Sequence, residues 1–397
     1  MSQALFLDIL DRGLSDAKVR FQVGGRDFIV GRGGNGNGHD PDVTVRVANP
    51  RVFHRTLTEG SLGLGEAYMA RDFDVEDDAL PKLLEILLRN RLDKKLRLRP
   101  MVAARVGLMR LTDMFIRGKA HNVQRHYDLG DDLFEAFLDS TMTYSCGYAT
   151  DPENDLETLQ QNKLERICRK LRLRPGLRLL DIGCGFGGLL IHAAKHHGVI
   201  ATGVTLSKRH CARGQENAAR AGVSDKVKIE YADFNDVKPE FDRVVSVGMM
   251  EHVPRHEYGK YFGKIAEVLP ADGLGLVHTI GANAAKNEHD PFGQKYIFPA
   301  ANQPQLSEIA RGLEVHGLAI LDVENMIRHY GYTAAGWLKN FRENRGKLDQ
   351  QKYDDSFQRM WEFYLSGAVA AARASDAALY QVLFAKDYAA PMPLHRV

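Results

Sequence analysis

Residues 174–281 alternate between short apolar runs and stretches with helical periodicity, and this alternation constrains the fold more than any other feature of the chain. Expected strands are 177–183, 199–205, 227–233, 242–250 and 274–281, separated by expected helices such as 189–197, 207–222 and 261–269. Strands joined by helices of this length form right-handed βαβ units. We therefore expect an α/β fold with a parallel sheet, helices on both faces, and a ligand site at the carboxyl ends of the strands.

The chain has 397 residues, more than one hydrophobic core usually organises, so a second domain is expected. The first 90 residues contain the short apolar alternations FQVGG, FIVG and VTVRV, followed by a helical pattern at 80–88. We predict a smaller α+β N-terminal accessory domain over residues 1–95, a basic amphipathic linker over 96–122, and the main domain over 123–397.

Overall composition favours no particular partner, because 53 basic residues nearly balance 51 acidic ones. The four cysteines, Cys146, Cys168, Cys184 and Cys211, show no CxxC or paired spacing, so we expect no metal site and a reduced, cytoplasmic compartment. The first thirty residues lack the apolar stretch of a signal peptide. No run approaches the roughly 18 apolar residues of a membrane span, so a lipid substrate would be met from the water side.

Residues 31–40, GRGGNGNGHD, are too rich in glycine and asparagine to support a packed element. Phosphate-binding loops share this composition, but no helix with Lys-Ser or Lys-Thr follows the run. A solvated hairpin loop is the preferred interpretation.

Residues 91–120 carry nine basic residues against two acidic ones, Asp93 and Asp113. Apolar residues such as Val102, Leu108 and Phe115 lie between them, which makes the segment basic and amphipathic. Two interpretations remain open: a linker helix with a solvated basic face, and a surface that docks on anionic phospholipid.

The most informative motif is DIGCGFGG at 181–188, at the end of the first expected strand. Gly183, Gly185 and Gly188 satisfy GxGxxG, so a dinucleotide enzyme is one interpretation. That fingerprint needs an acidic residue at the end of the second strand to hold the ribose, and this strand ends in threonine and leucine. With Asp181 before the glycines, the motif is instead the signature of class I S-adenosylmethionine-dependent methyltransferases, which have a Rossmann-like sheet.

Longer strings extend this match. They are EGSLGLGEAYM (59–69), HYDLGDDLF (126–134), YSCGY (144–148), LDIGCGFGGL (180–189), GVTLS (203–207), VSVGMMEHV (245–253), LVHTIG (276–281) and KYIFP (295–299). Through them the chain resembles the cyclopropane-fatty-acid synthases and the mycolic acid cyclopropane synthases over about residues 43–387. The resemblance implies that residues 123–397 form a methyltransferase catalytic domain with helical insertions.

The resemblance also implies the reaction: transfer of the methyl (methylene) carbon of S-adenosylmethionine to the cis double bond of an unsaturated phospholipid acyl chain, giving a cyclopropane. An alkene is a weak nucleophile, so the sulfonium methyl must be held in line with it. Transfer leaves a carbocation in the acyl chain. Water must be excluded from this cation, and a base must remove a proton from the new methyl group before the ring closes.

In the resembled family that base is a bound bicarbonate ion. Its ligands carry over to Cys146, Glu251, His278, Tyr330 and the main chain of Ile280, the expected catalytic residues. From residue type alone, Cys146 is typical of a small buried hydrophobe and His278 of a core histidine, but the YSC, EHV and HTIG contexts favour the site. Two neighbouring negative charges repel, so we expect Glu251 and the anion to share a proton.

Cofactor contacts carry over in the same way. They are Tyr144, Ser145, Leu179, Leu180, Asp181, Gly183, Cys184, Gly185, Gly187, Thr205, Leu206, Asp233 and Phe234. The rings of Tyr144, Tyr330 and Phe234 are expected to stabilise cationic intermediates. His210 stands where mycolic-type relatives have a glutamine.

One departure concerns the product: relatives commonly have a cysteine where Ala368 stands. The nearest alternative keeps the methyl transfer and ends in a methylene- or methyl-branched chain, because the cation loses a different proton. A second alternative is a non-catalytic lipid-binding protein. A nucleic-acid methyltransferase is disfavoured, since the sequence has no (N/D)PP(Y/F) motif, and no nucleic-acid partner is expected. The expected location is cytoplasmic, at the inner face of the membrane, and a homodimer is compatible with the resemblance.

Overall fold

The computed structural model describes residues 2–33, 40–92, 104, 107, 129–238, 241–283, 290–299 and 301–387. Two compact units result, each built from separate stretches of chain: 1–136, 287–299 and 338–376 in unit 1, and 137–286, 300–337 and 377–397 in unit 2. The predicted boundaries at 95 and 122 fall outside the described residues. So do most of the basic 91–120 segment and residues 34–39 of the glycine-rich run. Those interpretations stay predictions.

Unit 1 contains a four-stranded sheet in the order β2-β1-β3-β4. Its strands are β1 (Val19–Val23), β2 (Arg26–Val30), β3 (Val43–Val47) and β4 (Phe73–Val75), which include the three apolar alternations of the sequence. β1 and β2 form a hairpin whose turn, Gly24-Gly25, needs positive φ at both residues (55° and 78°), as a two-residue turn of this kind requires. The alternate residues Val19, Phe21 and Val23 are buried.

Helices complete unit 1. They are α1 (Ser2–Gly13), α2 (Arg51–Glu59), α3 (Ser61–Met69), α4 (Leu80–Arg89), α12 (Pro291–Tyr296) and α15 (Asp355–Arg373), with the 3-10 turns η1 (Glu76–Asp78) and η5 (Arg345–Lys347). Two family-specific strings meet here: the Glu66 carboxylate on α3 accepts hydrogen bonds from Lys295 (2.7 Å) and Tyr296 (2.9 Å) on α12. These contacts attach α12 to α3 although more than 200 residues separate them in the sequence.

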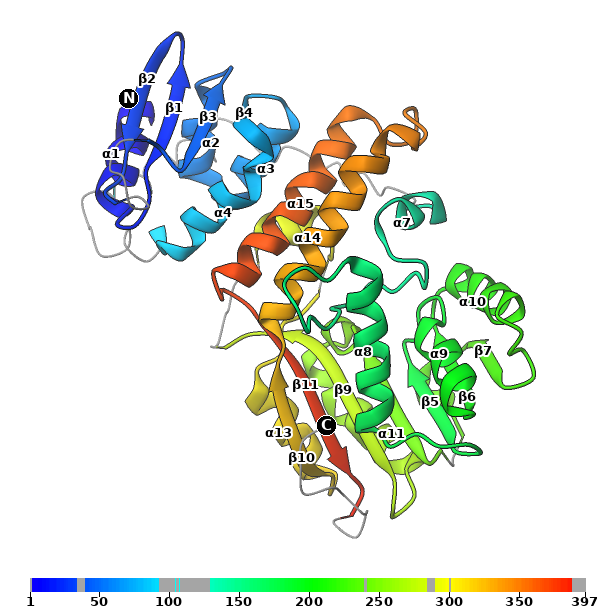
Figure 1. The fold of residues 1–397 in the computed structure, drawn as a ribbon. Helices are drawn as coiled ribbons and strands as arrows, with labels where there is room; N and C mark the ends of the chain where they lie inside the picture. The colour runs from blue at the N-terminus through cyan, green and yellow to red at the C-terminus, as the bar shows by residue number, and fades with distance from the viewer. Residues whose placement is uncertain are drawn as a thin grey trace. The chain divides into compact units, whose positions relative to one another are not determined.

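Unit 2 is built on a seven-stranded sheet in the order β10-β11-β9-β8-β5-β6-β7 (Figure 1). The strands are β5 (Arg178–Ile182), β6 (Ile200–Thr205), β7 (Val227–Tyr231), β8 (Arg243–Val247), β9 (Leu274–Gly281), β10 (Ala319–Asn325) and β11 (Ala378–Ala385). β5 pairs in parallel with both β6 and β8, so the strand order reverses between β5 and β8.

Two apolar cores cover the two faces of this sheet. One contains residues of α8 (Leu156–Lys170), α9 (Gly188–His197) and α10 (Lys208–Arg220), and the other contains residues of α11 (Tyr258–Val268) and α13 (Leu306–Val315). Successive side chains of a strand point to opposite cores. In β5, Leu179 lies in the first core and Leu180 in the second. The remaining elements are α7 (Asp131–Phe137), α14 (Ile327–Asn344), η2 (Phe234–Asp236), η3 (Met250–His252) and η4 (Arg255–Glu257).

The five expected strands are all present and pair in parallel with one another, as predicted, whereas β10 and β11 were not expected. The sheet is mixed, because β11 pairs antiparallel with both β9 and β10. All eight residues of β11 are buried, so the period-two pattern that marks a strand is missing from its sequence. It also follows the long helices α14 and α15 rather than a βα repeat.

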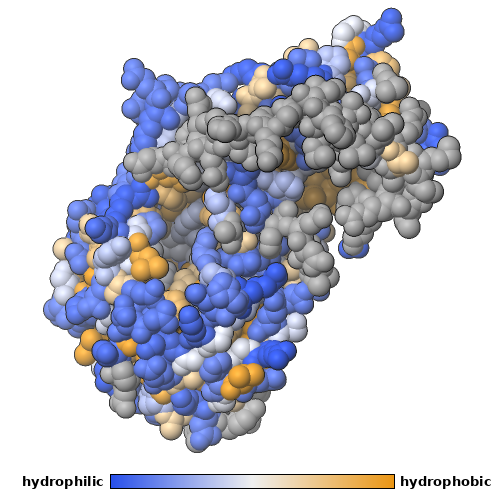
Figure 2. Space-filling model, turned by 180° about the vertical axis from the view of Figure 1, so that it is seen from behind, coloured by the Kyte–Doolittle hydropathy of each residue, from blue (hydrophilic) through white to orange (hydrophobic). Residues whose placement is uncertain are grey.

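The face of the molecule in Figure 2 is mostly hydrophilic, with apolar residues in small separate groups. Exposed large apolar side chains among the described residues include Leu206, Tyr231 and Val315. Within the described ranges, no helix combines the length and the apolar character needed to cross a membrane.

Candidate active site

The glycine-rich motif forms the turn from β5 to α9, at the carboxyl edge of the sheet where the strand order reverses. Gly183, Gly185 and Gly187 all have positive φ (83°, 53° and 82°), which side chains other than glycine rarely adopt. The N–H groups of Gly183 and Cys184 donate to the Val204 carbonyl of β6, which fixes the start of the loop. Open α/β sheets bind their ligands at such a reversal point.

Two observations show that this loop fits a bound cofactor. A Cβ atom added to Gly185 would meet no atom of the described residues within 4 Å, so the described part of the structure leaves space for a ligand at this position. The Asp181 side chain, only 3% exposed, has an oxygen, Oδ1, without a hydrogen-bond partner among the described residues. A buried carboxylate oxygen of this kind is satisfied by a ligand donor such as an amino group or a hydroxyl.

The segment that carries Tyr144 and Ser145 packs against the same edge of the sheet. A Cβ atom on Gly188 would lie 2.9 Å from the Thr141 carbonyl oxygen and from Thr143 Oγ1, and one on Gly248 would lie 3.8 Å from the Ser145 Cβ. The segment therefore contacts both the start of α9 and the turn after β8. The structure thus brings Tyr144 and Ser145 beside the glycine-rich loop.

Two buried side chains of α8 hold this segment, and sequence reasoning missed both. Gln160 donates from Nε2 to the carbonyl oxygens of Ser145 (2.8 Å) and Thr143 (3.4 Å). Lys163 donates from Nζ to the Ser145 hydroxyl (3.1 Å). They are only 0% and 1% exposed, although α8 has a strongly polar sequence that is typical of a surface helix.

Lys163 also sets the electrostatics beneath the loop. Burial lowers its pKa to about 8, against the attraction of Asp139, Cys146 and Asp181. Burial in turn raises the pKa of Asp181 to about 7, and Lys163 opposes that rise. A buried lysine and a buried carboxyl therefore titrate close to neutral pH beside the glycine-rich loop, which is typical of a functional site.

The other predicted cofactor residues lie along the same edge or just below it. Thr205 ends β6 and accepts from the Ser207 N–H at 3.2 Å, and Leu206 after it is 67% exposed. Asp233 follows β7 and caps η2 by accepting from the Asn235 N–H at 2.8 Å. Leu179 and Leu180 lie inside β5, with side chains in the two opposite cores. Cys184 is buried against β6, next to Gly203.

Glu251 lies beyond the end of β8, in the turn η3. β8 ends at Val247 opposite His278, so the next N–H on this edge of β9, that of Ile280, has no strand partner. The Glu251 carboxylate takes its place: Oε1 accepts from the Ile280 N–H at 3.2 Å and Oε2 accepts from the Thr279 hydroxyl at 2.6 Å. Burial raises the pKa of Glu251 above its ordinary value, against these two hydrogen bonds.

His278 is a buried histidine, and the hydrogen bonds of its neighbours determine which of its two ring nitrogens carries the proton. The Lys170 ammonium has only donors, so its contact with Gln381 makes the Gln381 oxygen the acceptor. The Gln381 amide nitrogen then faces His278 Nδ1 at 3.3 Å, and Nδ1 must accept. Because burial lowers the pKa of His278 to about 3, the ring is neutral and its proton is on Nε2. That atom has no partner among the described residues.

Cys146 and Tyr330 complete the predicted anion ligands. Cys146 is 1% exposed, and burial raises its pKa to about 12, so it is a neutral thiol rather than a thiolate nucleophile. Its sulfur lies 3.9 Å from the carbonyl oxygen of Met326, four residues before Tyr330 and at the start of α14. The residue pairs Glu251–Ile280 and Cys146–Met326 link the segments that carry the predicted ligands.

Aromatic rings surround this region. Trp337 of α14 lies between Tyr144 (ring centroids 5.2 Å apart) and Tyr330 (5.9 Å), and Phe137 packs edge-on against Tyr144 (5.5 Å). Trp337 therefore contacts both Tyr144 and Tyr330, although the sequence did not indicate it as a site residue. Phe234 instead packs on Tyr261, with ring centroids 5.7 Å apart.

Comparison with known proteins agrees with this geometry. Residues 116–382 match the family described as mycolic acid cyclopropane synthetase. The chain is 39% identical over 351 residues to a cyclopropane-fatty-acyl-phospholipid synthase of Escherichia coli strain K12, covering 88% of this chain and 89% of that protein. A cyclopropane synthase structure from Mycobacterium tuberculosis aligns with TM-score 0.62 and 28% identity, over 66% of this chain and 97% of its own. A mycolic acid cyclopropane synthase bound to SAH and CTAB aligns with TM-score 0.61 and 30% identity, over 66% and 97%.

Fold and site together define a class I S-adenosylmethionine-dependent methyltransferase, with the glycine-rich loop at the reversal point of a seven-stranded sheet. Within that class, the match over most of the chain is specific. The chain belongs to the mycolic acid cyclopropane synthetase family.

Proposed function

We propose that this enzyme adds the methylene carbon of S-adenosylmethionine across the cis double bond of an unsaturated phospholipid acyl chain and forms a cyclopropane fatty acid. The observation that carries the proposal is the 39% identity to a cyclopropane-fatty-acyl-phospholipid synthase over 88% of this chain. S-adenosylmethionine supplies an electrophilic methyl group when it is bound. The residues proposed to hold it are the thirteen cofactor contacts named above, from Tyr144 to Phe234.

The residues at the ends of β8 and β9 suit a small anion with a protonatable oxygen, and we propose bicarbonate. His278 offers an N–H from Nε2 that has no partner among the described residues. Cys146 is a neutral thiol whose S–H donates to the Gly147 carbonyl oxygen at 3.1 Å, so it would have to turn toward the anion. Glu251 has a raised pKa, so its carboxyl group accepts a proton more readily than an exposed one. The Ile280 N–H already donates to Glu251, so Ile280 acts on the anion by holding that carboxylate in place. Tyr330 is proposed as the fifth ligand.

The aromatic residues are proposed to stabilise the cation that forms in the acyl chain. Ring faces attract positive charge, with about 0.5–2 kcal/mol per favourable contact. Tyr144 and Tyr330 lie on either side of Trp337, which is 1% exposed. These apolar ring surfaces also exclude water, which would otherwise capture the cation.

The remaining assignments concern the whole chain. We propose that residues 1–95 form an accessory domain, that the basic segment 96–122 docks on anionic phospholipid at the inner face of the membrane, and that residues 123–397 carry out catalysis. Membrane docking is supported by the nine basic residues between positions 91 and 120 and by a substrate that resides in a bilayer.

A homodimer is the proposed assembly, and light scattering during size-exclusion chromatography would measure it.

Product analysis tests the proposed function. The purified enzyme is incubated with S-adenosylmethionine and vesicles of a mono-unsaturated phospholipid, and the acyl chains are examined by mass spectrometry and proton NMR. Because a cyclopropane and a methylene branch have equal mass, the ring methylene protons are the decisive signal. An exocyclic methylene or a methyl branch would point to the alternative product, and unmodified lipid would contradict enzymatic function.

Depletion of bicarbonate tests the proposed base separately. We expect turnover to fall in rigorously bicarbonate-free buffer and to recover when bicarbonate is added. Turnover that is indifferent to depletion would remove bicarbonate from the proposal while leaving the methyl transfer intact.

A further inference from the structure

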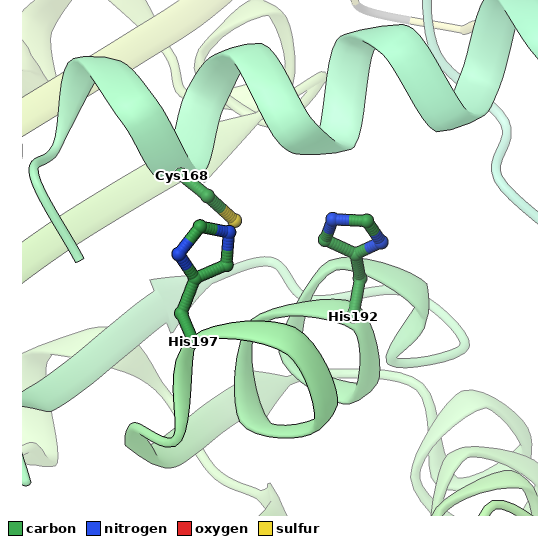
Figure 3. A group of neighbouring side chains, drawn as sticks. All are labelled: Cys168, His192 and His197. Atoms are coloured by element: carbon green, nitrogen blue, oxygen red, sulfur yellow. The ribbon is translucent and has the colours of Figure 1, made fainter. Parts of the chain in front are cut away.

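A cluster of sulfur, nitrogen and oxygen donors lies between α8 and α9 and is distinct from the residues assigned to the reaction. Among the described residues, Cys168, His192 and His197 form a group whose donor atoms all lie within 4.8 Å of one another. Figure 3 shows the two imidazole rings of α9 side by side, with the Cys168 sulfur of α8 next to the His197 ring.

Glu165 lies next to this group, outside the set whose donor atoms are all within 4.8 Å of one another. It precedes Cys168 by three residues on α8, and its Oε2 lies 3.0 Å from His197 Nε2 and 3.3 Å from His192 Nε2. In a tetrahedral site with Zn–N of about 2.0 Å and Zn–S of about 2.3 Å, neighbouring donors are about 3.3–3.6 Å apart. The two distances to Glu165 are close to this range, whereas metal binding requires side-chain rotations that bring Cys168 and the two histidines, now within 4.8 Å of one another, closer to the ion and to Glu165.

Burial and charge suit a metal ion. Cys168 is buried and both histidines are partly buried, so the cluster is shielded from bulk water. Arg169 approaches the other carboxylate oxygen of Glu165, Oε1, at 3.7 Å, which leaves Oε2 to the cluster. Cys168 is fully buried, so its thiol is protonated unless a cation replaces the proton.

We propose that Cys168, His192, His197 and Glu165 form a zinc-binding site that joins α8 to α9. A thiolate, two imidazoles and a carboxylate are donors that Zn²⁺ accepts, whereas Mg²⁺ and Ca²⁺ prefer oxygen alone. On binding, the Cys168 S–H bond breaks, a Zn–S bond forms and the proton passes to the buffer. Each imidazole binds through Nε2 and carries its proton on Nδ1. The two anionic donors then balance the charge of the ion.

The site would stabilise the helices that flank the cofactor loop. α8 carries Gln160 and Lys163, which hold the segment around Ser145, and α9 begins directly after the glycine-rich loop. Because all four donors come from the protein, no position is left open for a substrate, and the site is structural. The cysteine spacing in the sequence did not indicate it, because each helix contributes only two donors.

Cobalt titration of the metal-free, full-length protein tests the proposal. After treatment with a chelator, one equivalent of Co²⁺ should produce intense visible bands of tetrahedral cobalt and a thiolate-to-cobalt charge-transfer band in the near ultraviolet. Binding of Co²⁺ should release one proton per ion, and Zn²⁺ should then displace the cobalt and remove both bands without further proton release. Cys168→Ser should abolish the charge-transfer band, and His197→Gln should weaken affinity by more than tenfold.

His196→Gln is the matched control, because His196 is exposed on the same helix and its ring lies 4.6 Å from that of His192. The proposal requires this variant to bind cobalt as the wild type does. Binding that is lost in His196→Gln but kept in Cys168→Ser would assign the metal to a surface histidine pair and overturn the proposal. Failure of the folded wild type to show a charge-transfer band would overturn it as well. Zn²⁺ should also raise the melting temperature of the wild type but not of His197→Gln.

Discussion

At the scale of single residues, the candidate site depends on polar groups that are buried at strand ends. Glu251 occupies the position beside β9 that the end of β8 leaves without a strand partner. His278 is oriented by Gln381, which is itself oriented by Lys170. Each buried group costs free energy unless it is hydrogen-bonded, so the unpaired His278 Nε2–H needs an acceptor that the described residues do not supply. This requirement connects the geometry to an anionic ligand.

Glu251→Gln should leave the affinity for S-adenosylmethionine within a few-fold and reduce turnover by about 10²-fold or more, the usual scale for loss of acid–base function. Glutamine keeps an oxygen that accepts from the Ile280 N–H, so the local structure should persist. Single-turnover kinetics and calorimetry measure the two quantities. Glu257→Gln, six residues later and partly exposed, is the control. A Glu251→Gln enzyme with wild-type turnover would contradict the assignment.

The Asp181 carboxyl predicts a pH dependence of stability. Its pKa rises from 3.8 to about 7 on folding, mainly through burial, so the folded protein binds more protons than the unfolded chain between these values. The free energy of unfolding should therefore fall as pH rises from about 5 to 7. Asp181→Asn should flatten this part of the profile in urea denaturation, whereas Asp225→Asn at the exposed surface should not. Identical slopes in the wild type and Asp181→Asn would contradict the prediction.

The glycine-rich loop and the strand-end residues could be predicted from the sequence, because glycine spacing and strand periodicity are local signals. Lys163, Gln160 and Gln381 could not. The two α8 residues belong to a polar helix that looks solvent-exposed, and Gln381 interrupts an apolar strand with no motif around it. Their importance follows only from what packs against them in three dimensions. Trp337 was missed for the same reason. A tryptophan in an amphipathic helix is more often a core residue than part of an active site.

At the scale of elements, α8 is the helix that positions the cofactor segment. Gln160→Leu should lower the affinity for S-adenosylmethionine about tenfold, because an unpaired buried carbonyl at Ser145 costs about 1–3 kcal/mol and the segment would shift to regain a partner. Gln161→Leu is the matched control, since Gln161 is exposed on the same helix. Isothermal calorimetry on both folded variants decides the matter. Equal affinities would remove α8 from the positioning of the cofactor.

α15 carries the departure from the family pattern. Ala368, the position where the resemblance leads us to expect a cysteine, is partly buried on this helix. We expect Ala368→Cys to change turnover only modestly and to leave the product unaltered, because all five residues proposed to bind the anion or to hold its ligands are present without it. The measurement is the ratio of cyclopropane to branched product on the same lipid. A difference of about 1.4 kcal/mol between competing barriers changes that ratio tenfold. A shifted ratio would show that this position steers deprotonation.

At the scale of the whole molecule, each of the two compact units is built from three stretches of chain that are separate in the sequence. The sheet of unit 2 is continuous, but the chain that forms it is not. Residues 287–299 and 338–376 lie between its strands in the sequence and belong to unit 1. Local periodicity detects each helix in these segments, but not the unit against which the helix packs. For that reason the two strings at 59–69 and 295–299 resembled the family separately, while their contact through Glu66 became visible only in the structure.

The last prediction concerns the membrane. It tests the proposal that the basic segment meets phospholipid at the membrane surface. If residues 91–120 dock on lipid, vesicle binding should rise with the fraction of anionic lipid and weaken with salt, because attraction to a charged surface is screened beyond about 8–10 Å at physiological ionic strength. Reversing the charge of Lys94, Lys95, Arg97 and Arg99 should reduce binding by several powers of ten at low salt, since each basic residue near such a surface contributes about 1 kcal/mol.

Vesicle sedimentation at two salt concentrations measures this binding, and circular dichroism checks that the variant folds. Turnover on a short-chain phospholipid dispersed as monomers serves as the control, because it needs no bilayer. The charge-reversed enzyme should keep that turnover and lose activity on vesicles. Binding that is unaffected by both salt and charge reversal would identify the segment as a solvated linker, and the enzyme would then have to reach its lipid through another surface.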